Sequence, residues 1–291
     1  MDIQALKTFL AVAKSGSFSR AAQALHLTQP AVSKRIALLE QQLEVKLIDR
    51  LGRKIALTEA GDLLIKKAHT ILNELEDTRR SLKNLTGNIT GTLSLGISHH
   101  LGLHRLPSVL QEFSAFHPEV HLDIKFLDSE VAYQAVVRGE IELGVITLST
   151  DSMHHIKAQP VWKDTLNFVC AQSHPLASTR HVDLESLARY GCILPDLTTF
   201  TAKITAELFR QHRLPLTISM CTNYLETIRM MVSIGLGWSL LPATLSTPPL
   251  TVLDVPGISL HRNLGAIYHQ DRTLSNSARA FLNILARHSS L

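Results

Sequence analysis

Histidine is the residue type through which this chain could most readily carry out acid–base or metal chemistry, because its 291 residues include fifteen histidines. Three of them, His99, His100 and His104, lie in the segment SHHLGLH. The four-residue spacing of His100 and His104 would put both imidazoles on one face of a helix, where they could ligate zinc. The segment has no HExxH motif, no paired acid within reach and no third ligand at an obvious spacing. We therefore predict no metal site and no cofactor.

Other signatures of enzyme chemistry are also missing from the sequence. We find no GxSxG, no P-loop and no GxGxxG after a strand, so we predict that the chain is not an enzyme. The three cysteines, Cys170, Cys192 and Cys221, match neither a disulfide framework nor a CxxC metal site, and we expect buried, reduced thiols. The pair His154-His155 is expected in an exposed loop.

A different chemistry, contact with a polyanion, is indicated by the segment HLTQPAVSKRIALLEQQL at 26–43. Its apolar residues recur with helical spacing and predict one buried face: Val32, Ile36, Leu39 and Leu43. The opposite side begins with small or hydrogen-bonding groups and one cation, which we predict to contact DNA: Thr28, Gln29, Pro30, Ser33 and Lys34. Proline fits the first turn of a helix, where its missing N–H costs nothing.

Two shorter helices are predicted ahead of this segment. The first carries an apolar stripe from Leu6 to Ala13 and ends at the SGS turn, and the second begins after Ser17 as its N-cap. A short helix, a tight turn and a longer helix are typical of a helix-turn-helix, whose second helix enters the major groove. An ordinary three-helix core would explain the stripes equally well, but not the polar outer face.

The segment VKLIDRLGRKIALTEAG at 45–61 predicts a basic hairpin, with Gly52 at its tip and Arg50, Arg53 and Lys54 around it. Beside a recognition helix, such a hairpin would be a wing whose cations contact phosphates. Residues 1–58 contain nine Lys or Arg against four acids, a balance of +5, whereas the whole chain has +4. A cationic block on a near-neutral body is typical of a nucleic-acid-binding module, although a solvated basic surface is the alternative.

The run FLAVAKSGSFSRAAQALHLTQPAVSKRIALLEQQLEVKLIDR, followed by ALTEAG, resembles the N-terminal signature of LysR-type transcriptional regulators. The resemblance covers about the first 65 residues closely. It implies a winged helix-turn-helix, a long linker helix and a two-lobed α/β effector domain like that of periplasmic binding proteins. It also implies a dimer held by the linker helix, often within a tetramer.

The segment 58–87 is predicted to be that linker helix, with Thr58 as its N-cap. Its apolar positions alternate four and three residues apart, the seam of a coiled coil: Leu64, Ala68, Ile71, Leu75, Thr78, Leu82 and Leu85. This seam could pack against the same chain, but pairing with a second chain is favoured because two DNA-reading modules would then address two half-sites.

Beyond a hinge at 87–91, segments typical of strands and helices alternate in two series, which predicts two α/β lobes joined near 148–162 and 258–264. Ligands of open α/β sheets bind beyond the carboxyl ends of the strands. The polar residues expected there are Ser98, His99, His100, Thr147, Thr198, Thr199 and Thr201. The family resemblance implies that hydroxyl residues at such places bind the effector; His100 departs from that pattern. Nearby helix N-termini would favour an anion.

No run of about 18 apolar residues and no secretory signal is present, so we expect a cytoplasmic protein without a membrane partner. A transport solute-binding protein would need a signal, and the deep, narrow major groove of RNA disfavours a recognition helix. We predict a transcription factor that binds duplex DNA as a homodimer or tetramer and responds to a small anionic effector. The expected domains are residues 1–58, the linker 59–87 and 88–291, with lobe I at about 91–160 and 265–291 and lobe II at about 161–264.

Overall fold

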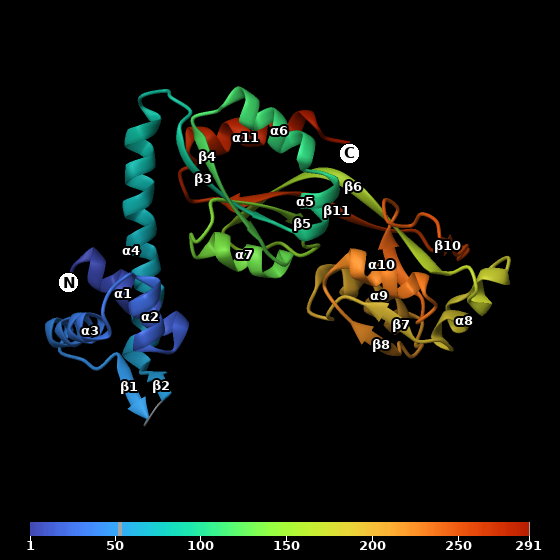
Figure 1. Ribbon diagram of the computed structural model, residues 1–291, viewed down its shortest axis with the longest axis horizontal. Helices are drawn as coiled ribbons and strands as arrows, with labels where there is room; N and C mark the ends of the chain where they lie inside the picture. The colour runs from blue at the N-terminus through green and yellow to red at the C-terminus, as the bar shows by residue number, and fades with distance from the viewer. Residues whose placement is uncertain (52–53, 291) are drawn as a thin grey trace. The chain divides into compact units, whose positions relative to one another are not determined.

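The computed structural model describes residues 1–51 and 54–290, without the side chains of residues 50, 51 and 54. The chain forms two compact units, Met1–Leu82 and Lys83–Leu291, and each is described by itself. Figure 1 labels the helices and strands of both units along the chain.

The first unit contains three helices, a hairpin and most of a long helix, as the sequence predicts. The elements are α1 Ile3–Ser15, α2 Phe18–Ala24, α3 Gln29–Leu43, β1 Ile48–Leu51, β2 Lys54–Leu57 and α4 Glu59–Asn84. The predicted N-caps are confirmed, because Ser17 accepts from the Arg20 N–H and Thr58 from the Gly61 N–H. The helices share one core in which Phe9 and Val32 are fully buried.

Helix α4 ends three residues earlier than the predicted boundary at Gly87. Its last residue, Asn84, donates to the carbonyl of Leu274 (2.9 Å) and accepts from the N–H of Asn276 (3.0 Å), so the helix terminus is held by the start of the C-terminal helix. Leu85 therefore lies beyond the helix and is 84% exposed. Extending the seam to Leu85 was wrong, since its side chain does not continue the helical face.

The second unit is built on a seven-stranded sheet in the order β10-β6-β11-β5-β3-β4, with β9 also paired to β6. In the first lobe, β3 is parallel to both β4 and β5, as the β-α-β-α-β pattern predicts. Helices α6 and α11 cover one face of these strands and α7 the other (Figure 1). The elements of this lobe are β3 Gly91–Ile97, α5 His99–His104, α6 Pro107–Phe116, β4 Val120–Phe126, α7 Ser129–Val137, β5 Leu143–Thr147 and α11 Asn276–Arg287.

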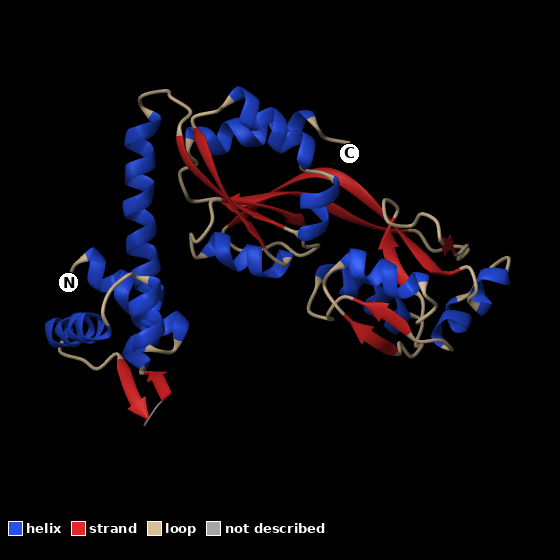
Figure 2. Cartoon of the chain, in the orientation of Figure 1, coloured by secondary structure: helices blue, strands red, loops and turns tan. Residues whose placement is uncertain are grey.

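The second lobe has a hydrophobic core of its own, which includes the fully buried Trp238. Figure 2 shows its strands in red among blue helices. Its elements are the 3-10 turn Pro175–Ser178, α8 Leu184–Ala188, β7 Cys192–Leu194, α9 Phe200–Gln211, β8 Ile218–Cys221, α10 Leu225–Ser233, β9 Ser239–Pro242 and β10 Leu250–Val252. Cys170 and Cys192 are buried as expected, but Cys221 is exposed because it ends an edge strand that pairs only with β7 among the described residues.

Two long antiparallel strands connect the lobes: β6 Ile156–Ala171 and β11 Leu260–His269. These strands run through the two predicted crossovers. The crossovers are therefore parts of long strands and not separate connecting segments. The pairing of these two strands has a register shift between Leu264 and Gly265. A Cβ on Gly265 would meet the Gln159 carbonyl oxygen at 2.2 Å, which requires glycine at this point.

Candidate functional site

The exposed face of α3 carries the residues predicted to contact DNA. Thr28, Gln29, Pro30 and Lys34 are exposed and Ser33 is half-buried. The Gln29 amide donates to the Ser33 hydroxyl (3.0 Å), so these two side chains form one hydrogen-bonding unit on adjacent turns. We expected the outer face of α3 to begin with polar and small groups. Farther along the helix, the large apolar residue Leu38 is 48% exposed.

The first turn of α3 offers few free N–H groups to an anion. Pro30 has none, and the Thr28 hydroxyl accepts from the N–H of Ala31 (3.4 Å) as the N-cap. Arg35 of the cationic block donates instead to the Thr8 hydroxyl (3.2 Å) and connects α3 to α1. Lys34 therefore remains as the exposed cation at the start of the helix.

The hairpin has the predicted antiparallel pairing, with Leu51 opposite Lys54. The side chains of Arg50 and Lys54, together with Gly52 and Arg53, lie outside the described residues. Glu40 of α3 positions the hairpin, because its carboxylate accepts from the N–H groups of Leu47 (2.9 Å) and Ile48 (3.2 Å) and binds Lys46 (3.1 Å). Burial opposes ionisation of Glu40, but these hydrogen bonds and the Lys46 cation together lower its pKa below the ordinary 4.5.

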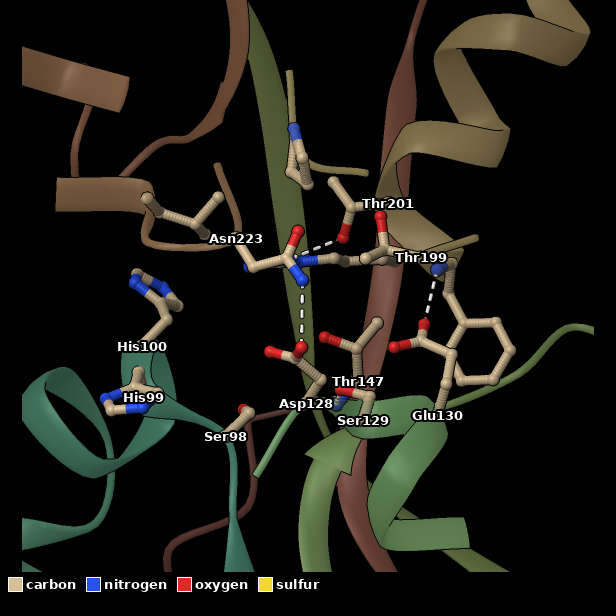
Figure 3. Close-up of a pocket in the computed structure, with 14 residues that line it drawn as sticks. Ser98, His99, His100, Asp128, Ser129, Glu130, Thr147, Thr199, Thr201 and Asn223 are labelled. Carbon is tan, nitrogen blue, oxygen red and sulfur yellow. Dashed lines mark hydrogen bonds between the residues drawn. The ribbon is translucent and has the colours of Figure 1, made fainter. Parts of the chain in front are cut away.

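In the second unit, a pocket between the two lobes collects six of the seven residues predicted to bind an effector. Its cavity volume is about 60 Å³, and those lining it are Ser98, His99, His100, Thr147, Thr199 and Thr201. Figure 3 shows their side chains around a shared space. Thr198 is the exception: it is exposed and its hydroxyl donates to Asp196 (2.6 Å), so it is part of a turn and does not line the pocket.

The hydroxyl groups of the pocket differ in how they are engaged. Thr199 is the N-cap of α9, accepting from Ala202 (3.2 Å) and donating to the Asp196 carbonyl (2.7 Å). The Ser98 hydroxyl, at the N-cap position of α5, is buried and has no hydrogen-bond partner among the described residues. A buried hydroxyl without a hydrogen-bond partner is costly in a folded protein.

Arg262 is one pocket residue that sequence reasoning missed. It is 6% exposed on β11, and its guanidinium donates to Asp164 (2.8 Å) and to the Thr201 hydroxyl (2.7 Å). Its Nη2 atom is buried without a partner among the described residues. Burial lowers its pKa and the Asp164 carboxylate opposes that effect. The signal available in the sequence was an arginine within the segment ISLHRNLGAIY. Because part of this segment was assigned to a crossover between the lobes, Arg262 was not expected at the pocket.

Two hydrogen bonds join the lobes across the pocket (Figure 3). The Glu130 carboxylate at the start of α7 accepts from the Phe200 N–H of α9 (2.6 Å), and the Asn223 amide donates to Asp128 (2.8 Å). Burial raises the pKa of Glu130. These four residues also line the pocket and were not predicted, since nothing in their local sequence indicates pairing over 70 and 95 residues.

Family models match nearly the whole chain. Residues 3–62 match the model described as "Bacterial regulatory helix-turn-helix protein, lysR family", and residues 86–290 match "LysR substrate binding domain". Among the helices of the described ranges, none has the length and apolar character needed to cross a membrane.

Curated relatives agree with these matches. An uncharacterized HTH-type transcriptional regulator in the ibpB-leuC intergenic region of Azotobacter vinelandii is 64% identical over 107 residues, covering 37% of this chain and 74% of that protein. A probable RuBisCO transcriptional regulator of Synechocystis sp. is 30% identical over 287 residues, covering 95% of this chain and 83% of that protein.

Solved structures share the fold. Full-length CbnR complexed with its target DNA has a TM-score of 0.66 at 20% identity, covering 99% of this chain and 100% of that one. The effector binding domain of QuiR in complex with shikimate has a TM-score of 0.62 at 20% identity, covering 69% of this chain and 97% of that one. With a helix-turn-helix unit, a two-lobed α/β unit and both family models matched, this chain belongs to the LysR family of transcriptional regulators, with a DNA-binding and an effector-binding domain.

Proposed function

We propose that this regulator binds duplex DNA as a homodimer or tetramer, and that a small anionic effector binding between the lobes alters its hold on DNA. We assign DNA binding to residues 1–58, dimerisation to 59–87 and effector binding to 88–291. As a LysR-family protein it would act by regulating transcription and not by catalysis.

The exposed residues of α3 support the DNA contact. Gln29 and Ser33 can read base edges as a pair, because the hydrogen bond between them leaves the Gln29 carbonyl and the Ser33 hydroxyl proton free to contact a base. Lys34 directly follows Ser33, is exposed, and can contact a phosphate or a base. CbnR, which shares the fold, has been solved with its target DNA.

The observation that carries the effector proposal is the pair of buried, unpartnered polar atoms at the pocket, Ser98 Oγ and Arg262 Nη2. A guanidinium with a free N–H and a nearby hydroxyl suit a carboxylate or another small anion. The acidic pocket residues Asp128 and Glu130 already accept hydrogen bonds and would favour a hydroxyl or amine on the same effector. QuiR binds shikimate, a hydroxylated carboxylate, in a domain of this fold.

The exposed seam of α4 supports self-association. Ile71 is 40% exposed and Leu82 62%, although both belong to one apolar stripe of a strongly polar helix. Such a stripe on a long helix is stable when a second helix covers it. A second copy of α4 would present the matching stripe.

The effector proposal is tested with the full-length protein. A panel of small carboxylates that includes shikimate is screened by thermal shift, and each one that raises the midpoint is then assayed for its effect on binding to selected operator DNA. Ser98→Ala and Thr147→Val should each abolish the effect while basal DNA affinity is unchanged; Ser152→Ala, at an exposed serine outside the pocket, is the control. A wild-type response in both pocket variants would contradict the proposal.

A further inference from the structure

His100, His104 and Glu226 come together at the edge of the pocket. The two histidines lie on α5 of the first lobe, and Glu226 lies in the first turn of α10 in the second lobe. The three candidate ligand atoms all lie within 4.8 Å of one another. The sequence offered the histidine pair without a third ligand, and the fold brings that ligand from 122 residues away.

From this geometry we infer that His100, His104 and Glu226 bind a divalent transition-metal ion, with Zn²⁺ as the preferred ion, across the two lobes. The inference does not depend on the effector proposal, because a metal could bind whether or not the neighbouring pocket holds an anion.

Two of the three distances between the candidate ligand atoms are close to those of a tetrahedral ion. With metal–ligand bonds of about 2.0–2.1 Å, neighbouring ligand atoms of a tetrahedral site are about 3.3 Å apart. Glu226 Oε1 lies 3.0 Å from His104 Nε2 and 3.6 Å from His100 Nδ1, on either side of that value. Two imidazoles and one carboxylate form a ligand set typical of zinc, whereas Mg²⁺ and Ca²⁺ prefer oxygen ligands alone.

The buried atom His100 Nδ1 is the observation that points to a ligand. His100 is 5% exposed, and its Nδ1 atom has no hydrogen-bond partner among the described residues, so a metal would supply the missing interaction. Its other ring nitrogen, Nε2, lies 3.5 Å from the Thr244 hydroxyl, the kind of outer contact that orients a metal-binding imidazole.

The cluster is open to solvent on one side. His104 and Glu226 are each about one-third exposed, which gives an ion access from solvent.

A metal held by both lobes would restrict their relative movement. Because two ligands come from α5 and one from α10, separating the lobes would break a coordination bond. The ion would therefore stabilise the conformation in which the lobes meet, and binding and lobe closure would be coupled.

The test is a Zn²⁺ titration of the full-length, tag-free, EDTA-treated protein against a chromophoric chelator. We expect one ion per chain in the wild type, and at least about a 100-fold weaker affinity in His104→Gln and in Glu226→Gln, since losing a ligand should cost at least as much as losing an outer contact. Both positions are partly exposed, so these variants should fold. Co²⁺ absorption would report the same loss of ligands.

A second cluster in the chain gives a matched control. This cluster also has three candidate ligand atoms within 4.8 Å of one another, from His155, His269 and Asp271. Its residues are largely exposed, and none of them lies on α5 or α10. His155→Ala should therefore leave the affinity unchanged. Wild-type affinity in His104→Gln and Glu226→Gln, or loss of binding in His155→Ala alone, would overturn the inference.

Discussion

At the scale of single residues, two positively charged side chains have opposite surroundings. Lys34 is exposed at the start of α3, whereas Arg262 is buried at the pocket between lobes and bonded to Asp164 and Thr201. Removing an exposed cation affects only the binding of its partner. Removing a buried cation also destabilises the fold, because its buried partner is left unpaired. Substitutions at the two sites should therefore be detected in different experiments.

Lys34→Ala should weaken DNA binding without changing the stability of the protein. If Lys34 contacts a phosphate, the slope of log affinity against log salt should fall by about one; if it contacts a base, about 1–3 kcal/mol of binding should be lost at one position of the operator. Fluorescence anisotropy over a salt series measures both. Lys157→Ala, which removes an exposed charge from the second unit, is the control, and equal behaviour of the two variants would exclude Lys34 from the contact.

Arg262→Met should lower the free energy of unfolding by about 3–5 kcal/mol, because it leaves the Asp164 carboxylate buried without its main partner. Urea unfolding followed by tryptophan fluorescence measures this in the second unit, which contains both tryptophans, Trp162 and Trp238. The double variant Asp164→Asn/Arg262→Met should be less destabilised than the sum of the two single variants. Additive losses would show that the pair is not coupled.

At the scale of elements, the hairpin and the linker helix each depend on contacts that local sequence does not reveal. The hairpin is attached to α3 by Glu40, which precedes it by several residues. The linker helix has an apolar seam that is covered near Ala68 but exposed at Ile71 and Leu82. The first element is complete within one chain, and we propose that the second requires another copy.

Glu40→Gln should destabilise the first unit by about 1–3 kcal/mol at pH 7, because two N–H groups and Lys46 lose a charged acceptor. The folded-state pKa of Glu40 is lowered, so its contribution is present above the ordinary value of 4.5 and is lost as pH falls through the folded pKa. The difference between wild type and variant should therefore shrink in acid. A difference that is constant from pH 7 to strongly acidic pH would contradict this role.

Leu75→Asp should dissociate the oligomer, since it puts a charge into the proposed apolar interface at a cost of several kcal/mol. Sedimentation would show a lower mass, and operator binding would weaken because two linked DNA-reading modules become independent. Thr70→Asp, at an exposed position outside the seam, should remain associated. Wild-type mass in Leu75→Asp would mean that α4 packs against its own chain.

At the scale of the whole molecule, two DNA-reading modules in one dimer predict a strict dependence on operator geometry. Half-sites should be separated by about 10 bp or a multiple of it. Inserting 5 bp between them should weaken binding much more than inserting 10 bp, because the first insertion rotates one half-site to the opposite side of the duplex. Gel-shift titrations on the three operators measure this, and equal affinities would indicate that one module binds alone.

Local sequence was enough to predict the helices of the first unit and which face of the recognition helix is buried. The stripe Val32, Ile36 and Leu39 is buried as predicted, and the N-caps Ser17 and Thr58 begin their helices, because apolar periodicity and capping act within a few residues. The motif at 9–61 was specific enough to indicate the family. Strand ends also predicted six pocket residues, since parallel strands bring their carboxyl ends to one edge.

Tertiary structure alone decided which distant residues meet. Arg262, the Glu130–Phe200 contact and the grouping of Glu226 with His100 and His104 depend on two long strands and on lobes that approach each other across more than 60 residues of sequence. Thr198 and Thr199 are adjacent in sequence and both hydroxyls donate to Asp196, yet only Thr199 lines the pocket. Such pairings leave no signal in the local sequence. The free energy that selects them comes from burying the hydrophobic cores of the two lobes and not from the paired residues.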